Sequence, residues 1–497
     1  VNGHAGCVDV LAMDARGNLH RQAALLVPGV RGAGKVNSIA IRSGVLAVAA
    51  NGADSNQAPG SVTFFAATTG DWLGRVHVGA MPDMLTFTPD GTKVVVANEG
   101  EPNSYGLGDA LDPEGSISII DIEMPAPGEI RVLDVRTASF AVFNDQRESL
   151  QAAGVRIFGP GASVAQDLEP EYIAVSADST WAYVTLQENN ALATVNLKSG
   201  IVESIVSFGL KNHALPGQGL DPSDRDGGIN IRNEPLVGMF QPDAIAAFTV
   251  QGTTYLLTAN EGDARAYPGF AEAARLGDAA VRLDAQTFSN ASELKAPGRL
   301  GRLEISRATG DLDADGDLDQ LHAFGVRSIS IWTTEAELVW DSGEALERLA
   351  AAHAPTHFNA SNTDNLLDSR SDAKGPEPEG VAVGQAYGRV LAFVGLERFG
   401  GIAMFDISDP ASPTLLHYVN TRDWSVVPSQ ETLEAVGDLG PEGLAFVPQA
   451  DSPTGRPLLL VGNEVSGTTT VFTIVPTATE PQPASQAAPG NEPASLP

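Results

Sequence analysis

Cysteine, positive charge and long apolar runs are all scarce in this chain of 497 residues. The single cysteine, Cys7, excludes an intrachain disulfide, so the fold must be held by packing or by bound ions. Lys and Arg number 30 against 62 Asp and Glu, and the net charge of −32 repels phosphate backbones and anionic bilayers. We therefore expect no nucleic-acid partner. Because no apolar run reaches about 20 residues, we also expect no membrane insertion.

The two ends of the chain differ from its middle in composition. The sequence begins at Val1 without Met or a signal-like segment, as a processed mature protein does. We therefore expect a secreted, periplasmic or cell-surface protein whose leader is absent. Residues 476–497 are rich in Pro, Ala, Ser and Glu, with too few large apolar side chains to offset the entropy of ordering. This composition predicts a folded domain over residues 1–475 and a disordered tail over residues 476–497, with no hydrophobic anchor after it.

Short strands separated by Gly, Pro, Asn and Asp clusters fill the rest of the chain and predict an all-β fold. A repeat recurs among them: Pro and an acid (the opening acid), a strand, a turn, and a second apolar strand followed by Glu (the closing acid). A degenerate copy runs from Asn37 to Gly52. The five full copies pair Pro82-Asp83 with Glu99, Pro170-Glu171 with Glu188, Pro242-Asp243 with Glu261, Pro378-Glu379 with Glu397, and Pro441-Glu442 with Glu464.

Most copies continue into a third and often a fourth strand, which is typical of propeller blades. We predict a single seven-bladed β-propeller of four-stranded antiparallel blades. The gap between Asp243 and Glu379 is about twice the usual spacing, and we expect a seventh blade there, built from residues 328–332 and 337–340.

The ring of blades needs a closure between the two ends of the chain. Two N-terminal strands, residues 8–13 and 19–26, precede the first full repeat. We expect them to complete the blade that begins at Glu442.

Hairpin topology brings the acids of each repeat together, because the start of one antiparallel strand lies beside the end of the next. If the first strands line the axis, all these acids meet at one mouth of a central channel. Like charges at such density require metal ions, raised pKa values, or interleaved Arg and Lys. Alternatively, each acid only bonds backbone amides of a neighbouring blade. The predicted acidic ring consists of Asp83, Glu99, Glu171, Glu188, Asp243, Glu261, Glu379, Glu397, Glu442 and Glu464.

A second acidic element has carboxylates at alternate positions around Gly316, which matches the first half of a calcium-binding loop. His322 stands at the twelfth position, where an EF-hand needs a bidentate Glu, so a complete EF-hand is excluded. We expect calcium here, against the alternative of a solvated acidic turn. The predicted ligands are Asp311, Asp313, Asp315, Asp317 and Asp319.

A third acidic element is the turn-rich segment from Asp221 to Gly228. Its carboxylates, Asp221, Asp224 and Asp226, are candidate metal ligands. Arg225 lies among them, so a loop braced by ion pairs is the alternative.

Several longer segments resemble the choice-of-anchor I family of bacterial extracellular proteins. They are residues 227–231, 258–265, 374–380, 394–398 and 462–468. Relatives of that family include an echinoderm mesenchyme-specific cell-surface glycoprotein and proteins labelled alkaline phosphatase. The resemblance implies a secreted or surface-displayed propeller, although this sequence shows none of the C-terminal anchors for which the family is named.

Two functions fit these observations. The first is a calcium-dependent binding or adhesion module that recognises an extracellular glycan, protein or mineral surface through the acidic mouth. The second is a calcium-dependent phosphoesterase of the alkaline phosphatase or phytase type, in which Arg265, Lys374 and Arg398 would hold the phosphate. No nucleophile motif stands out in the sequence, so binding is favoured over catalysis.

Overall fold

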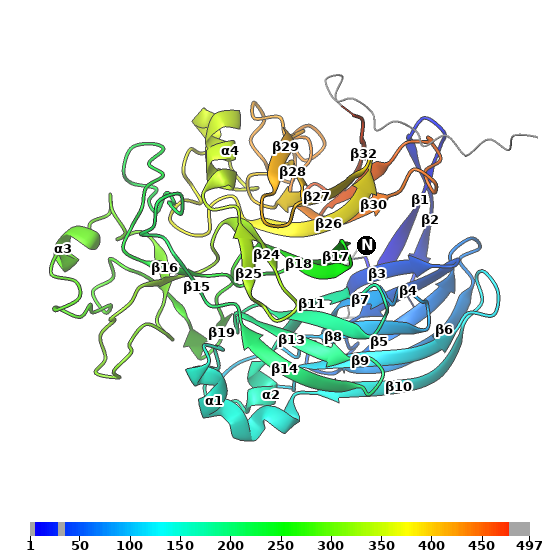
Figure 1. Ribbon diagram of the computed structural model, residues 1–497, viewed down its shortest axis with the longest axis horizontal. Helices are drawn as coiled ribbons and strands as arrows, with labels where there is room; N and C mark the ends of the chain where they lie inside the picture. Colours follow the sequence, from blue (N-terminus) through cyan, green and yellow to red (C-terminus); the bar gives the residue numbers. More distant parts are fainter. Residues whose placement is uncertain (1–4, 28–34, 477–497) are drawn as a thin grey trace, which may run out of the picture.

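The computed structural model describes residues 5–27 and 35–476, so nearly all of the predicted tail lies outside the described residues. Six antiparallel sheets of three or four strands follow one another along the chain (Figure 1). They are β3–β6 (Val36–Arg42, Val45–Ala50, Pro59–Ala66, Trp72–Ala80), β7–β10 (Pro82–Phe87, Lys93–Asn98, Ser116–Glu123, Arg131–Ser139), β11–β14 (Pro170–Val175, Trp181–Leu186, Ala191–Asn196, Ile201–Ser207), β17, β18, β24 and β25 (Ile245–Val250, Thr253–Asn260, Ser328–Trp332, Leu338–Asp341), β26–β29 (Pro378–Ala386, Arg389–Leu396, Ile402–Asp406, Thr414–Val419), and β30–β32 (Pro441–Val447, Leu458–Asn463, Thr468–Thr473). The all-β prediction is confirmed.

Helices are few and short among the described residues. They are η1 (Ala141–Gln146), α1 (Arg147–Ala152), α2 (Val164–Asp167), α3 (Ala291–Leu294), α4 (Ala345–His353) and η2 (Pro355–His357). In the part of the chain that the structure describes, no helix has the length and apolar character needed to cross a bilayer.

The burial of the strands follows their position within each sheet. The second strands β4 and β8 are almost entirely apolar and buried, because other sheets cover both of their faces. The fourth strands β10 and β14 are far more exposed, with one buried residue in β10 and two in β14, because one of their faces is solvated. The first strands contact one another in chain order, β3 with β7, β7 with β11, β11 with β17, β17 with β26, and β26 with β30. The first strands therefore surround a common axis, which is the arrangement of a β-propeller.

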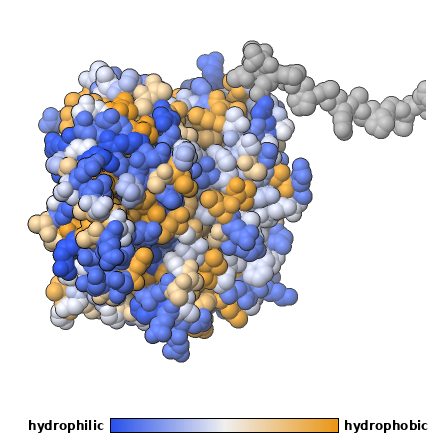
Figure 2. Space-filling model, turned by 60° about the vertical axis from the view of Figure 1, so that its left-hand side comes forward, coloured by the Kyte–Doolittle hydropathy of each residue, from blue (hydrophilic) through white to orange (hydrophobic). Residues whose placement is uncertain are grey.

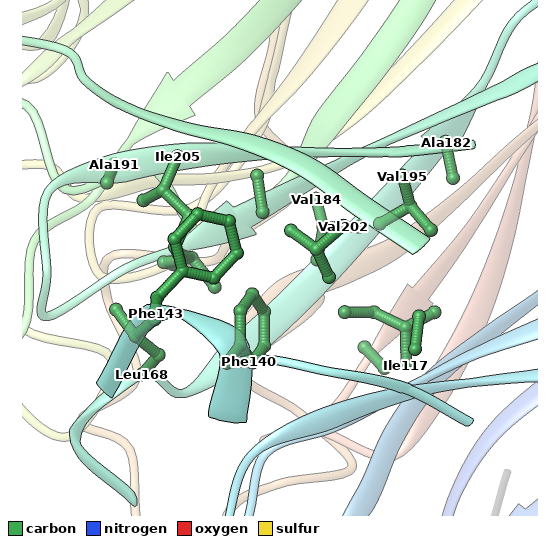
Figure 3. Packing of buried hydrophobic residues seen from close by; sticks show 14 of the residues in the cluster. Ile117, Phe140, Phe143, Leu168, Ala182, Val184, Ala191, Val195, Val202 and Ile205 are labelled. Carbon is green, nitrogen blue, oxygen red and sulfur yellow. The ribbon is translucent and has the colours of Figure 1, made fainter. Parts of the chain in front are cut away.

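Side chains fill the space between neighbouring sheets. Figure 3 shows one such core, where Ile117 on β9 packs near Val184 and Val195 of the next sheet. Phe140 and Leu168 close this core from the segments around η1 and α2, and neither is exposed. Burying one large apolar side chain contributes about 1.5–3 kcal/mol, so the sheets are held together chiefly by these contacts.

The prediction of a seventh blade between Asp243 and Glu379 is wrong. β24 pairs with β18, with Leu256 opposite Trp332, and β25 pairs with β24, so these strands complete the sheet that begins at β17. The spacing doubles because residues 261–327 are inserted between the second and third strands of that sheet.

The insertion carries secondary structure of its own. It supplies β21–β23 of a five-stranded sheet in the order β15-β16-β23-β22-β21, and a small β19–β20 hairpin, whereas β15 and β16 come from the segment between β14 and β17 (Figure 1). In Figure 2, which turns this side forward, hydrophilic and hydrophobic residues alternate over the surface. The strands are β15 (Leu210–Asn212), β16 (Val237–Met239), β19 (Ala266–Tyr267), β20 (Phe270–Ala271), β21 (Ala273–Arg275), β22 (Glu304–Ser306) and β23 (His322–Ala323).

The N-terminal strands form a hairpin, β1 (Cys7–Met13) with β2 (Leu19–Leu26). Among the described residues this hairpin is a separate two-stranded sheet, so the expected hydrogen bonding to the last sheet is not found. Val8 and Leu25 pack with Val36 of the first sheet, and Gly17 lies opposite Thr454, beside the last sheet. The hairpin thus contacts the two ends of the series through side chains rather than by closing a sheet.

Candidate cation sites

Four of the five opening acids lie in β-bulges at the starts of first strands. The register shifts directly after Pro82, Pro170, Pro378 and Pro441, so the acid that follows each proline is out of the ladder. A bulge re-aims the side chain it carries, and proline has no N–H to lose at that point. The degenerate copy has the same shift, but Asn37 stands there and donates to the Asn51 side chain.

The closing acids lie beside the opening acids, as the hairpin argument predicts. Pro82 pairs with Asn98, and Pro441 pairs with Asn463, so the residues that follow in each strand meet at one end of the hairpin. Between blades, Asp243, Glu261 and Glu379 place carboxylate oxygens within 4.8 Å of one another. The structure therefore brings acids of different repeats into one cluster.

The hydroxyl of Tyr172 is influenced by several acids of this cluster. Burial raises the pKa of its hydroxyl, and the charges of Asp243, Glu442, Asp83 and Glu379 raise it further. Those four acids open four different blades, so acids of separate blades act together on this one side chain.

Burial raises the pKa values of the ring acids, and neighbouring ring acids add to the shift. The pKa of Asp83 rises to about 6 from burial and the nearby Glu101. The pKa of Glu397 rises to about 8 from burial, Glu377 and Glu261. Burial also raises the pKa values of Glu188 and Glu442 to about 7, and it raises those of Glu99, Glu171, Asp243, Glu261 and Glu379. Glu464, the remaining member, is exposed beside Glu442.

The interleaved cations gather around Glu377, whose side chain is fully buried. Lys374 Nζ lies 2.5 Å from Glu261 and 3.1 Å from Glu377, and Arg398 Nε lies 3.0 Å from Glu397. Although burial alone would raise it, Lys374, Arg370 and Arg398 hold the pKa of Glu377 down at about 2. Lys374 and Arg398 are thus at the ring, as predicted, but each is already paired with carboxylates.

The third proposed phosphate ligand, Arg265, is enclosed by the protein. Its side chain is completely buried, contacts Asp167, and places Nη2 3.1 Å from Glu169. Its guanidinium also covers the Phe158 ring at 4.6 Å, and that of Arg156 lies 4.3 Å from the same ring. Arg265 therefore anchors the insertion to the propeller, and a substrate-holding role does not fit this position.

The predicted calcium loop has two groups of carboxylates. Asp311, Asp313 and Asp315 place their oxygens within 4.8 Å of one another, and so do Asp317 and Asp319 with Asp284. Gly316 takes φ of +92°, which permits the tight turn, and its N–H donates to Asp311 at 2.9 Å. Sequence reasoning missed Asp284, which a bridge between Leu283 and Leu318 brings to the loop.

The acids of the third segment, from Asp221 to Gly228, lie in two different environments. Asp221 and Asp226 lie with Asp368, their oxygens within 4.8 Å of one another. Asp224 instead pairs with Arg302 at 2.8 Å and with Arg225 at 3.3 Å, so the salt-bridge alternative holds for this residue. Burial, together with the neighbouring acids, raises the pKa of Asp221 to about 8 and that of Asp368 to about 7.

The residues that sequence reasoning missed share a feature. Glu101, Glu377 and Asp368 lie outside the opening and closing positions of the repeat, so its periodicity did not select them. Glu101 and Glu377 each stand next to a proline and close to a ring acid in sequence, and that spacing was the available signal.

Two proteins from marine animals resemble parts of the chain. It is 33% identical over 182 residues to Gigasin-3a of Magallana gigas, covering 35% of this chain and 64% of that protein. It is 28% identical over 302 residues to a mesenchyme-specific cell surface glycoprotein of Strongylocentrotus purpuratus, covering 54% of this chain and 38% of that protein. The chain thus spans less than two thirds of the length of either relative.

Solved structures resemble the chain only distantly. The periplasmic gluconolactonase PpgL of Pseudomonas aeruginosa has a TM-score of 0.34 at 14% identity, covering 85% of this chain and 89% of that chain. The Swd1 β-propeller domain of Myceliophteria thermophila has a TM-score of 0.37 at 9% identity, with 95% of both chains covered.

A family model matches most of the chain. The model is that of the choice-of-anchor I domain, and the match runs over residues 2–410. This range contains the first four sheets, three strands of the fifth, the insertion and eight of the ten ring acids. The chain therefore belongs to the choice-of-anchor I family.

Proposed function

We propose that this protein is an extracellular calcium-binding β-propeller that acts as a binding or adhesion module through its acidic mouth. The observation that carries the proposal is the convergence of acids from four blades on Tyr172. Oxygens within 4.8 Å of one another suit Ca²⁺, since two ligands at about 2.3–2.6 Å from one ion lie at most about 5 Å apart. The family and the cell-surface relative support an extracellular setting. In this proposal the β1–β2 hairpin is an incomplete seventh blade.

Calcium would change what the mouth can recognise. Without cations, a cluster of carboxylates repels anions. With bound Ca²⁺, vacant coordination positions accept hydroxyl or carboxylate oxygens of an extracellular glycan, protein or mineral surface. The exposed loop around Gly316, with its two acid groups, provides further calcium sites.

A calcium-dependent phosphoesterase is the alternative, and it needs cationic side chains that are free to hold phosphate. Lys374 and Arg398 both contact Glu377, and each contacts a ring acid as well. Binding is therefore favoured over hydrolysis.

Calcium titration by calorimetry tests the proposal on chelator-treated protein and on the Glu261→Gln/Glu379→Gln variant. We expect the variant to bind fewer calcium ions than the parent protein. A glycan array tests recognition separately, and we expect the parent protein to bind glycans in calcium but not in chelator. A matched control is Glu148→Gln, an exposed position on α1. An unchanged number of bound calcium ions in the double variant would show that the acidic mouth does not bind calcium. Calcium-dependent hydrolysis of a phosphomonoester or phytate would replace the binding module with the enzyme.

A further inference from the structure

We propose that Asp221, Asp226 and Asp368 bind a buried Ca²⁺. This ion would join the five-stranded sheet that contains β15 and β16 to the propeller. Asp221 and Asp226 come from the loop between β15 and β16, whereas Asp368 comes from the segment between η2 and β26. Their oxygens lie within 4.8 Å of one another. The site is separate from the acidic ring, and it stands or falls independently of the proposed function.

Asp226 supplies the observation that points to a ligand. Its side chain is only 5% exposed, and neither carboxylate oxygen accepts a hydrogen bond. A buried carboxylate without hydrogen bonds is costly, by several kcal/mol, unless a cation faces it. The nearest cation is Arg232, whose Nη1 lies 3.7 Å from Asp226 Oδ2. The Nε of Arg232 donates to Glu234 at 2.6 Å. Asp226 therefore points an unsatisfied charge at the two other acids.

The other two acids of the site have no counterion among the described residues. Asp221 is fully buried and Asp368 is 4% exposed, and neither forms an ion pair within the described residues. The nearby Glu347 is neutralised by Arg327 at 2.5 Å, so this pair does not offset the other acids. Three carboxylates that face one guanidinium at 3.7 Å suit a divalent ion better than a monovalent one.

Existing bonds hold the three carboxylates in place. Asp221 accepts the Asn230 N–H at 2.5 Å, and Asp368 accepts the Ser371 hydroxyl. Each of the two keeps acceptor capacity for an ion, because a carboxylate has about four lone-pair positions. Asn230 and Arg232, which contact Asp221 and Asp226, also line a surface pocket of about 510 Å³. Calcium suits this position better than Mg²⁺, which demands near-ideal octahedral geometry and retains its waters.

The first test counts bound calcium by equilibrium dialysis of the full chain against Ca²⁺ alone. We expect Asp226→Asn and Asp368→Asn each to bind one ion fewer than the parent protein. The matched control is Asp224→Asn, which lies in the same loop but pairs with Arg302. It should retain the full count. A full count in both Asp226→Asn and Asp368→Asn would overturn the proposal.

The second test measures thermal stability and keeps the proposal falsifiable if a variant folds poorly. In chelator, Asp226→Asn should melt at or above the parent temperature, because it removes an unpaired buried charge. In calcium, it should melt below the parent. Equal losses in both conditions would show a purely structural residue and overturn the site.

Limited trypsin digestion locates the effect. Arg225 is 63% exposed and adjoins Asp226, so loss of the ion should speed cleavage after Arg225. We expect faster cleavage for Asp368→Asn than for the parent in calcium, and equal rates in chelator. Equal rates in calcium would contradict the proposed link.

Discussion

At the scale of single residues, buried charges decide which side chains can be altered. Arg265 and Lys374 both look like surface cations in the sequence, yet each lies among carboxylates that have lost contact with water. Removing one partner of a buried pair leaves an uncompensated charge, which costs about 3–5 kcal/mol.

Lys374→Met is therefore expected to lower the free energy of unfolding by about 3–5 kcal/mol, since it removes the ion-pair partner of Glu261 and one of the three cations that contact Glu377. Chemical denaturation followed by circular dichroism measures the change. Lys198→Met, at an exposed position, serves as the control. A loss no larger than that of the control would show that the ring does not depend on this cation.

His213 predicts an acid-sensitive element. Burial and the nearby Lys211 lower its pKa from 6.5 to about 3, so it stays neutral in the fold while the unfolded chain takes up a proton. Its contribution to stability is thus present above pH 6.5 and is lost as pH falls toward 3, at about 1.4 kcal/mol per pH unit. His213→Gln should flatten the stability profile in this window. A profile identical to that of the parent would assign acid sensitivity to other groups.

At the scale of elements, short loops and bulges position the acids. The bulge after each opening proline turns one carboxylate away from the ladder. The loop around Gly316 does the same with alternate aspartates, and its turn depends on a φ of +92°.

Gly316→Ala should weaken calcium binding by this loop. A side chain at this φ costs about 1–2 kcal/mol, and its Cβ would lie 2.9 Å from Arg282 Nη2, so affinity should fall about 5- to 30-fold. Calorimetric titration checks this value against Gly74→Ala, whose Cβ would meet open space. Unchanged affinity would indicate that the loop does not bind calcium.

At the scale of the whole molecule, the acidic ring links stability to pH and calcium. Carboxyl groups with raised pKa values hold protons more tightly in the folded than in the unfolded chain. Their contribution to folding stability is fully present below the ordinary carboxyl pKa of about 4. It is lost as pH rises through the pKa values in the folded chain, which are about 6 for Asp83 and about 8 for Glu397.

In chelator, the melting temperature should therefore fall as pH rises from about 6 to about 8. Calcium should reduce this fall, because bound ions replace the lost protons. Differential scanning calorimetry at several pH values, with and without calcium, measures both effects. A melting temperature in chelator that rises over this interval would contradict the ring electrostatics.

The sequence alone determined what is local. Strand pairs, the adjacency of opening and closing acids, and the Asp311–Asp319 loop depend on turns and on contacts between nearby residues, so their patterns are readable in order along the chain. Membership in the choice-of-anchor I family agrees with those motifs.

Only the tertiary structure decided the contacts between distant segments. It nested residues 261–327 inside one blade, buried Arg265 against Asp167, and brought Asp368 to Asp221. These contacts join segments about 70 residues or more apart, and they depend on how whole sheets pack around the axis. No local spacing encodes that packing, because burial is a property of the assembled molecule.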